Sequence, residues 1–167
     1  MTSAWRVEKL NRAHSVDDFR CGQPDLDRFL IRHALQAQRA NSSQSYVALD
    51  GDKVAGFYTF VVGQAEAADA PARVVKGMPR HPIPLLILAR LAVHLDWQGR
   101  GVGAGLLRDA LRRTLQVADI AGVRALAVHA KDDAGGSFYR HFGFAASPTD
   151  DRHLFLLIKD IVAAAGA

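Results

Sequence analysis

The sequence contains a single cysteine, Cys21, among its 167 residues. One cysteine cannot form a disulfide within the chain or supply a metal cluster made of thiolates. Its thiol could serve as a nucleophile or as a half-buried structural side chain, and we expect the structural role. Histidines do not compensate, because no His-x-x-x-His pair occurs in the chain. We therefore predict no metal site, including at His94, His129 and His141.

Long apolar runs are also absent. The longest, Ile83–Ala89, is short and contains Pro84, so no segment approaches the roughly 20 apolar residues that a membrane-spanning helix needs. The first residues, MTSAWRVEKLNRAH, have neither the basic start nor the apolar block of a signal peptide. Together with the cysteine usage, these absences predict a cytoplasmic protein that does not engage a membrane.

A strong excess of one charge is the third feature that the sequence lacks. Lysine and arginine number 21 against 17 aspartate and glutamate residues, which gives a net charge of +4. Such a mild excess permits a polyanionic partner without requiring one. The length and an apolar fraction of 49% suit one domain with a substantial core, and we predict a single domain over residues 1–167.

Hydrophobic periodicity predicts strands alternating with helices. An Asp-Gly pair between two β-rich runs predicts a hairpin. A buried strand, a helix and a second buried strand predict a parallel βαβ unit. Residues 63–84 show little periodicity and are expected to form a long, partly ordered and functional loop. The predicted fold class is α/β, with a mixed central sheet flanked by helices. The predicted strands are 5–10, 44–50, 53–62, 84–94, 123–130 and 153–161, and the predicted helices are 24–40, 103–120 and 135–143.

Four glycines, Gly99, Gly101, Gly103 and Gly105, separate a buried strand from a helix. Backbone N–H groups at a helix start bind phosphate, and side chains there would obstruct its approach. The Gly-Lys-Ser/Thr ending of a P-loop is missing, and the Gly-x-Gly-x-x-Gly of a dinucleotide-binding loop fits only loosely. A merely flexible turn is the alternative. We expect the loop to hold a phosphate or a pyrophosphate.

The segment QGRGVG resembles the Gln/Arg-x-x-Gly-x-Gly/Ala signature of the GNAT superfamily of N-acetyltransferases, with Gln98, Gly101 and Gly103 at the signature positions. The strand before it, the helix after it and the later segment FYRHFGF follow the order found in that superfamily. Three longer segments resemble the TacT-like GNAT toxins of bacterial toxin–antitoxin modules. They are FRCGQPDLDRFLIRHALQAQ, IPLLILARLAVHLDWQGRGVGAGLLRDALRR and VHAKDDAGGSFYRHFGF.

The resemblance implies a GNAT fold, acetyl-CoA as the cofactor and an amine as the acetyl acceptor. Toxins of this branch acetylate the α-amino group of aminoacyl-tRNA, which blocks translation. They pair with a ribbon-helix-helix antitoxin, whose C-terminal tail wraps the toxin. The resemblance also implies a homodimer that meets DNA only through the antitoxin.

The resemblance assigns cofactor contacts to the strand end and the glycine loop. The pyrophosphate of coenzyme A would lie on backbone N–H groups at the positive end of the helix dipole. The extended pantetheine arm would pair with the strand end, where a backbone N–H would polarise the thioester carbonyl. The residues so assigned are Leu91, Ala92, Val93, Gln98, Gly99, Arg100, Gly101, Val102, Gly103 and Ala104.

Tyr139 stands at the position of the family's catalytic tyrosine within FYRHFGF. A phenol with a pKa of about 10 keeps a proton at neutral pH that a departing thiolate can accept. We predict that Tyr139 is the general acid; the alternative is that it only packs among the nearby phenylalanines. Asp132 and Asp133 are expected to cap its helix. Gly135 and Gly136 depart from the family pattern and weaken a short helix by roughly 1 kcal/mol each.

The strand segment LLILARLAV carries no Asp or Glu that could act as a general base, and the nearest candidates are His94 and Asp96. An α-amino group, with a pKa of about 7.7 to 8.0, is already partly neutral, whereas a lysine at about 10.4 needs help to lose its proton. The missing carboxylate therefore favours an α-amine acceptor. For contacts to tRNA we predict Arg90, Arg80 and Lys76.

Two other functions stay open at this point. A GNAT enzyme could instead acetylate a protein N-terminus, a lysine or a small amine. Alternatively, the protein could bind coenzyme A without turnover and act with an antitoxin in a repressor complex on DNA.

Overall fold

The computed structural model describes residues 5–79 and 81–165, so Arg80 lies outside the described residues. Seven strands belong to one mixed sheet in the order β1-β2-β3-β4-β5-β7-β6. The chain divides into two compact units. The first unit comprises Met1–Val61 and Ala89–Asp109, and the second comprises Val62–Leu88 and Ala110–Ala167. No helix of the described residues is long and apolar enough to cross a membrane.

The first unit is built on antiparallel strands. Strand β1 (Trp5–Lys9) pairs with β2 (Gln44–Asp50), and β2 pairs with β3 (Lys53–Ala65). The turn from β2 to β3 has two central residues, and Gly51 takes a φ of +63° there. A left-handed turn residue matches the twist of the flanking strands, which is why Asp-Gly marks hairpins. The predicted hairpin is confirmed.

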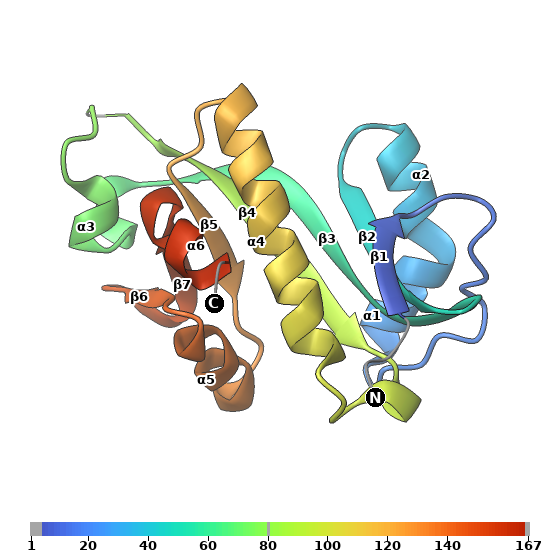
Figure 1. The fold of residues 1–167 in the computed structure, drawn as a ribbon. Helices are drawn as coiled ribbons and strands as arrows, with labels where there is room; N and C mark the ends of the chain where they lie inside the picture. Colours follow the sequence, from blue (N-terminus) through green and yellow to red (C-terminus); the bar gives the residue numbers. More distant parts are fainter. Residues whose placement is uncertain (1–4, 80, 166–167) are drawn as a thin grey trace. The chain divides into compact units, whose positions relative to one another are not determined.

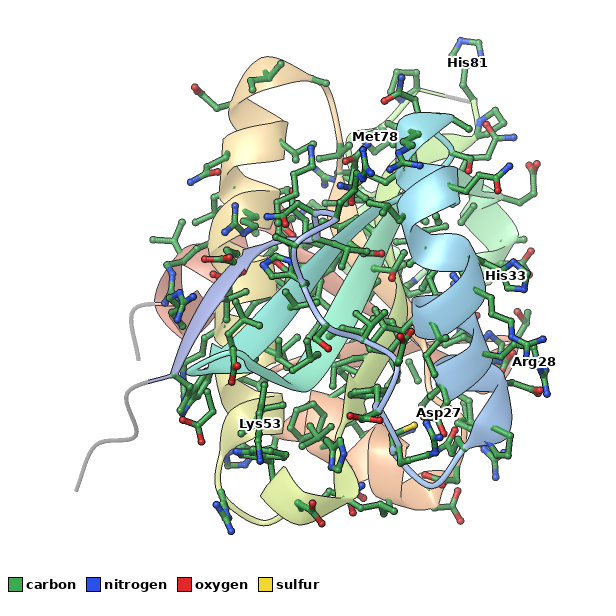
Figure 2. The ribbon with its side chains drawn as sticks, turned by 90° about the vertical axis from the view of Figure 1, so that its right-hand side faces the viewer. Asp27, Arg28, His33, Lys53, Met78 and His81 are labelled. Atoms are coloured by element: carbon green, nitrogen blue, oxygen red, sulfur yellow. The ribbon has the colours of Figure 1, made fainter. Side chains whose placement is uncertain are left out.

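A helical segment covers the hairpin (Figure 1). It begins at Pro24 and ends at Arg39, in agreement with the prediction. One detail was not predicted: α1 (Pro24–Arg28) and α2 (Ala34–Arg39) are joined by a π-helical turn, η1 (Phe29–His33). Figure 2 shows Arg28 and His33 on the outer side of this segment. The buried core beneath it includes Leu30, Ala34, Val47, Leu49, Val54 and Phe57.

Strand β4 (Ile83–Val93) leads through a short 3-10 turn, η3 (Leu95–Trp97), and the glycine loop into helix α4 (Val102–Ile120). Two glycines allow close packing within the first unit. A Cβ on Gly56 would lie 2.8 Å from the Ala92 carbonyl oxygen, and a Cβ on Gly105 would overlap the Trp5 ring. The Tyr58 hydroxyl also donates to the Asp109 carboxylate at 2.6 Å, which ties β3 to α4.

In the second unit, β5 (Ala125–His129) pairs with β4 in parallel, which confirms the pairing predicted for the βαβ unit. Strand β7 (Asp150–Leu157) pairs with β5 and with the three-residue β6 (Ala145–Ser147), both antiparallel. Helix α5 (Asp133–His141) precedes β6, and α6 (Ile158–Ala165) follows β7 (Figure 1).

One predicted element has the wrong end, and one strand was not predicted. The last strand does not reach residue 161; it ends at Leu157 and α6 begins at once. Ile161 is fully buried from that helix, so an apolar residue read as part of a strand packs at helical spacing. Strand β6 was not predicted, because three residues carry too little alternation to be recognised.

The predicted loop 63–84 is more ordered than expected. Strand β3 continues to Ala65, and two short helices follow, η2 (Ala67–Asp69) and α3 (Ala72–Val75). Long-range hydrogen bonds fix them. The Thr149 hydroxyl donates to Asp69 at 2.9 Å, and the Arg124 guanidinium donates to the carbonyls of Val74 and Lys76, both at 2.9 Å. These partners are remote in sequence, so periodicity within the segment could not reveal them.

Candidate active site

The glycine loop takes a conformation that favours glycine at two positions. Gly99 has a φ of +78° and Gly101 a φ of +84°, in the left-handed region that side chains rarely adopt. A Cβ at either position would meet no atom within 4 Å. The backbone conformation therefore favours glycine at both positions, whereas crowding within the fold does not require it. The space beside the loop stays open.

The start of α4 places three backbone N–H groups ahead of the first helical hydrogen bond. The Gly105 N–H donates to the Gly101 carbonyl at 3.0 Å, which is the first hydrogen bond of the helix. The N–H groups of Val102, Gly103 and Ala104 therefore precede any intrahelical acceptor. Gly101 has no side chain that could cap them, and the first turn carries no acidic residue. This arrangement fits an anion such as a pyrophosphate, which the helix dipole also favours.

Gln98 anchors the loop to the end of β4. Its side-chain amide donates to the Val93 carbonyl at 3.0 Å and to the Cys21 carbonyl at 3.2 Å. The Gln98 side chain thus forms hydrogen bonds to the backbone and holds the strand end, the glycine loop and the segment before α1 together. These carbonyl groups lie 5 and 77 residues from Gln98 in sequence. A local sequence motif could therefore indicate only the contact with Val93.

Cys21 is buried, and its backbone N–H donates to the Asp27 carboxylate at 2.9 Å. Figure 2 shows Asp27 on the inner side of α1, facing the preceding segment. Burial, and then the hydrogen bond to Asp27, raise the pKa of the Cys21 thiol to about 11. Since the thiolate is the nucleophilic form, this environment supports the structural role over the nucleophilic one.

His94 does not offer a free base beside the strand end. Its Nδ1 accepts a hydrogen bond from the Asp96 N–H at 3.0 Å. An accepting Nδ1 leaves the proton of a neutral imidazole on Nε2, so the lone pair that a base needs is already engaged. The ring also packs edge-on against Phe19 and Trp97. His94 therefore shapes the turn after β4.

Tyr139 lies on α5 in the second unit, and the start of that helix is capped. The Asp132 carboxylate accepts a hydrogen bond from the Gly135 N–H at 2.8 Å, which confirms the cap predicted at Asp132. Tyr139 is 8% exposed, and its ring packs edge-on against Phe138 and Phe144. Burial raises the pKa of its phenol well above the ordinary value, so the hydroxyl remains a hydrogen-bond donor at every physiological pH.

Gly136, the second glycine before Tyr139, lies against an arginine side chain. A Cβ on Gly136 would lie 3.1 Å from Nη1 of Arg140, which folds back along α5. The other terminal nitrogen of Arg140 donates to the Asp151 carbonyl on β7 at 2.8 Å. The same strand reaches the start of the helix through Arg152, which donates to the Lys131 carbonyl at 3.1 Å. These bonds to β7 restrain the helix that two glycines weaken.

The predicted tRNA contacts fall in different parts of the chain. Arg90 lies on β4 in the first unit, and its guanidinium stacks 3.6 Å above the centre of the Phe29 ring. Lys76 is exposed in the second unit at the end of α3, and Arg80 lies outside the described residues. Of the three residues, Arg90 belongs to the same unit as the strand end and the glycine loop. The sequence did not indicate Phe29, because its contact with Arg90 joins residues that are far apart in the chain.

Comparison with known proteins gives a consistent result. A family model described as "Acetyltransferase (GNAT) domain" matches residues 41–146. The tRNA-acetylating toxin of Mycobacterium tuberculosis (strain ATCC 25618 / H37Rv) is 44% identical over 158 residues, which cover 95% of both chains. AtaT complexed with acetyl-methionyl-tRNAfMet has a TM-score of 0.88 at 26% identity, over 95% of this chain and 98% of that one. A Tyr-to-Phe mutant of AtaT bound to acetyl-CoA and the C-terminus of the antitoxin AtaR has a TM-score of 0.81 at 25% identity, over 95% and 96%.

Proposed function

Because the chain belongs to the GNAT acetyltransferase family, we propose that it transfers the acetyl group of acetyl-CoA to the α-amino group of an aminoacyl-tRNA and thereby blocks translation. The observation that carries this proposal is the match, over 95% of both chains, to a protein named tRNA-acetylating toxin. The family model matches parts of both units, which supports one GNAT domain over residues 1–167.

The first unit would hold the cofactor. The three N–H groups at the start of α4 would bind the pyrophosphate, and the positive φ of Gly99 and Gly101 keeps their approach open. Arg100 is exposed in the same loop and adds a positive charge. The backbone of Leu91–Val93 would pair with the pantetheine amides and orient the thioester carbonyl. When bound, acetyl-CoA supplies an activated acetyl group.

Tyr139 would serve the leaving thiolate. Its buried phenol is protonated at neutral pH, because burial raises its pKa, and it can donate a hydrogen bond as negative charge develops on sulfur. The nitrogen of the amine must lose a proton as the new amide forms. Tyr139 passes its phenol proton to the thiolate, and the proton from the amine nitrogen then returns the phenolate to a phenol. The buried Tyr139 oxygen therefore carries no charge at the end of the transfer.

The acceptor would be an amine that needs little help to lose its proton. No carboxylate stands on Ile83–Val93, and the accepting nitrogen of His94 is engaged by a backbone N–H. An α-amino group, with a pKa of about 7.7 to 8.0, is partly neutral without a strong base. A site of this kind is better matched to the α-amine of an aminoacyl ester than to the side chain of lysine.

The proposal extends to partners. The AtaT mutant bound to the C-terminus of its antitoxin supports an antitoxin partner for this chain. We propose that this antitoxin is of the ribbon-helix-helix type, as the TacT-like branch implies, and that the chain meets DNA only within that complex. We also propose a homodimer, as the TacT-like branch implies. A substrate as abundant in the cytoplasm as aminoacyl-tRNA supports a cytoplasmic location.

A cell-free translation reaction tests the proposed function. We expect the protein to inhibit protein synthesis when acetyl-CoA is present and to leave it unaffected when acetyl-CoA is replaced by coenzyme A. The Tyr139→Phe variant keeps the ring and should relieve most of the inhibition. Equal inhibition with both cofactors would favour a binding function without turnover and would overturn the proposal.

A further inference from the structure

We propose that Phe29 is a positioning residue that holds the Arg90 guanidinium ready to bind the tRNA phosphate nearest the aminoacyl ester. This inference rests on the proposed function, because it names part of the site for the same substrate. It assigns a role to an aromatic side chain that the reaction itself does not use.

The stack beneath Arg90 is anchored in the core. The Arg90 guanidinium lies 3.6 Å above the centre of the Phe29 ring, close enough for a cation–π interaction. Phe29 also stacks on Phe57, with 6.4 Å between ring centres and 19° between ring planes. Phe57 is completely buried. The arginine therefore rests on a side chain whose own position is fixed by the core.

Phe29 is the first residue of the π-helical turn in the segment that covers the hairpin. The Ala34 N–H donates to the Phe29 carbonyl, five residues back, which is a π-type hydrogen bond. Leu30 of this turn enters the core, and Phe29 packs at the edge of the same core. Such π turns inside α-helices are frequent at functional sites.

Arg90 has a charge without an anionic partner. No carboxylate among the described residues forms an ion pair or hydrogen bond with it, and partial burial lowers the pKa of its guanidinium. A stacked guanidinium still presents its N–H groups at its edge, in a planar fork that matches two phosphate oxygens. The cation is thus partly desolvated in advance and lacks only its counter-ion.

The place of Arg90 in the chain selects which phosphate it would bind. It directly precedes Leu91–Val93, the backbone proposed to orient the thioester. The α-amine of an aminoacyl-tRNA must reach that carbonyl, and the amino acid is esterified to the terminal nucleotide. The phosphate that comes closest to Arg90 is therefore the one that joins the last two nucleotides at the 3′ end. If Arg90 binds this phosphate, the amine is positioned for the transfer.

Steady-state acetylation of one purified aminoacyl-tRNA tests this role in a double-mutant cycle. The variants are Phe29→Leu, Arg90→Ala and both together, with Arg12→Ala as a matched control for the loss of an exposed positive charge. We expect Phe29→Leu to raise KM for aminoacyl-tRNA on the order of tenfold and to leave KM for acetyl-CoA unchanged. Phe29→Tyr keeps the aromatic face and should restore the wild-type value.

The cycle separates positioning from mere packing. If Phe29 acts through Arg90, then Phe29→Leu adds nothing in the Arg90→Ala background. The dependence of log KM on log salt should also lose about 0.7 of its slope in Arg90→Ala, as expected for one phosphate contact on a single strand, and none in Arg12→Ala. Additive effects, or an unchanged salt slope, would overturn the proposal.

Failure of this inference differs visibly from failure of the proposed function. If the wild-type protein does not acetylate aminoacyl-tRNA, the proposed function is wrong and no variant is needed to show it. If the wild type is active and Arg90→Ala leaves KM for tRNA unchanged but weakens neutralisation by the antitoxin, the cation serves the antitoxin and the inference is wrong. Should Phe29→Leu misfold, Arg90→Lys tests whether the stacked guanidinium is needed. Lysine keeps the charge but loses the planar fork, so an unchanged KM for aminoacyl-tRNA would overturn the proposal.

Discussion

Alanine in place of Gly101 separates two roles of the glycine loop, the backbone conformation and the access of a phosphate. Gly101 has a φ of +84°, and a Cβ there would meet no atom within 4 Å. A left-handed conformation costs an alanine roughly 1 to 2 kcal/mol. For a chain of this length, that corresponds to a fall in Tm of about 2 to 8 °C.

The chain contains a matched control for the conformational cost. Gly77 has a φ of +80°, a Cβ there would also meet nothing within 4 Å, and it belongs to the other unit. Gly77→Ala should therefore lose a similar amount of stability. It should leave the affinity for coenzyme A unchanged, because Gly77 is not part of the start of α4.

Gly101→Ala should lose affinity as well as stability. A methyl group on Gly101 would enter open space directly before the helix start that is proposed to bind the pyrophosphate. Losing a hydrogen bond to a charged group costs about 1.5 to 3 kcal/mol, which is roughly a 10- to 100-fold rise in Kd. Calorimetric titration with coenzyme A measures the affinity, and scanning calorimetry measures Tm. Equal affinities for the two alanine variants would refute the assignment of this loop to the cofactor.

Three further predictions concern single side chains. Tyr139→Phe should lower kcat about 100- to 10,000-fold while the Kd for coenzyme A stays unchanged. A rate near that of the wild type in a single-turnover assay would show that Tyr139 is not the general acid. Asp132→Ala should lose about 1 kcal/mol of unfolding free energy, with recovery in Asp132→Asn, because the cap needs only an accepting oxygen; denaturant titration of both variants checks this, and equal losses would contradict it. Cys21, with a pKa of about 11, should react with iodoacetamide at pH 8 more than 100-fold more slowly than a free peptide thiol; labelling at the peptide rate would mean that the thiol is not held as the structure shows.

The features predicted correctly from sequence are those that depend on neighbouring residues. The hairpin follows from Asp50-Gly51. The cap of α5 follows from Asp132, whose carboxylate accepts a hydrogen bond from the N–H of Gly135, three residues further along the chain. The anion site between β4 and α4 stays a prediction. It could be drawn from the glycine spacing because a helix start and its flanking glycines are local properties of the sequence.

The features that were missed depend on contacts between distant parts of the chain. Phe29 and Arg90 are 61 residues apart, and only the folded chain stacks one on the other. The order of residues 66–76 rests on Arg124 and Thr149. The boundary at Leu157 was misplaced because a short apolar segment suits either a strand or a helix until its packing partner is known.

The most direct test of the central claim is mass spectrometry of a charged tRNA pool incubated with the protein and acetyl-CoA, after digestion to aminoacyl-adenosine. We expect one added acetyl group on the amino acid, at its α-nitrogen, and we expect this group to be absent with Tyr139→Phe. The amino acid that carries it would identify the tRNA. If coenzyme A binds and no aminoacyl-adenosine in the pool gains an acetyl group, the acceptor is not aminoacyl-tRNA and the account is contradicted.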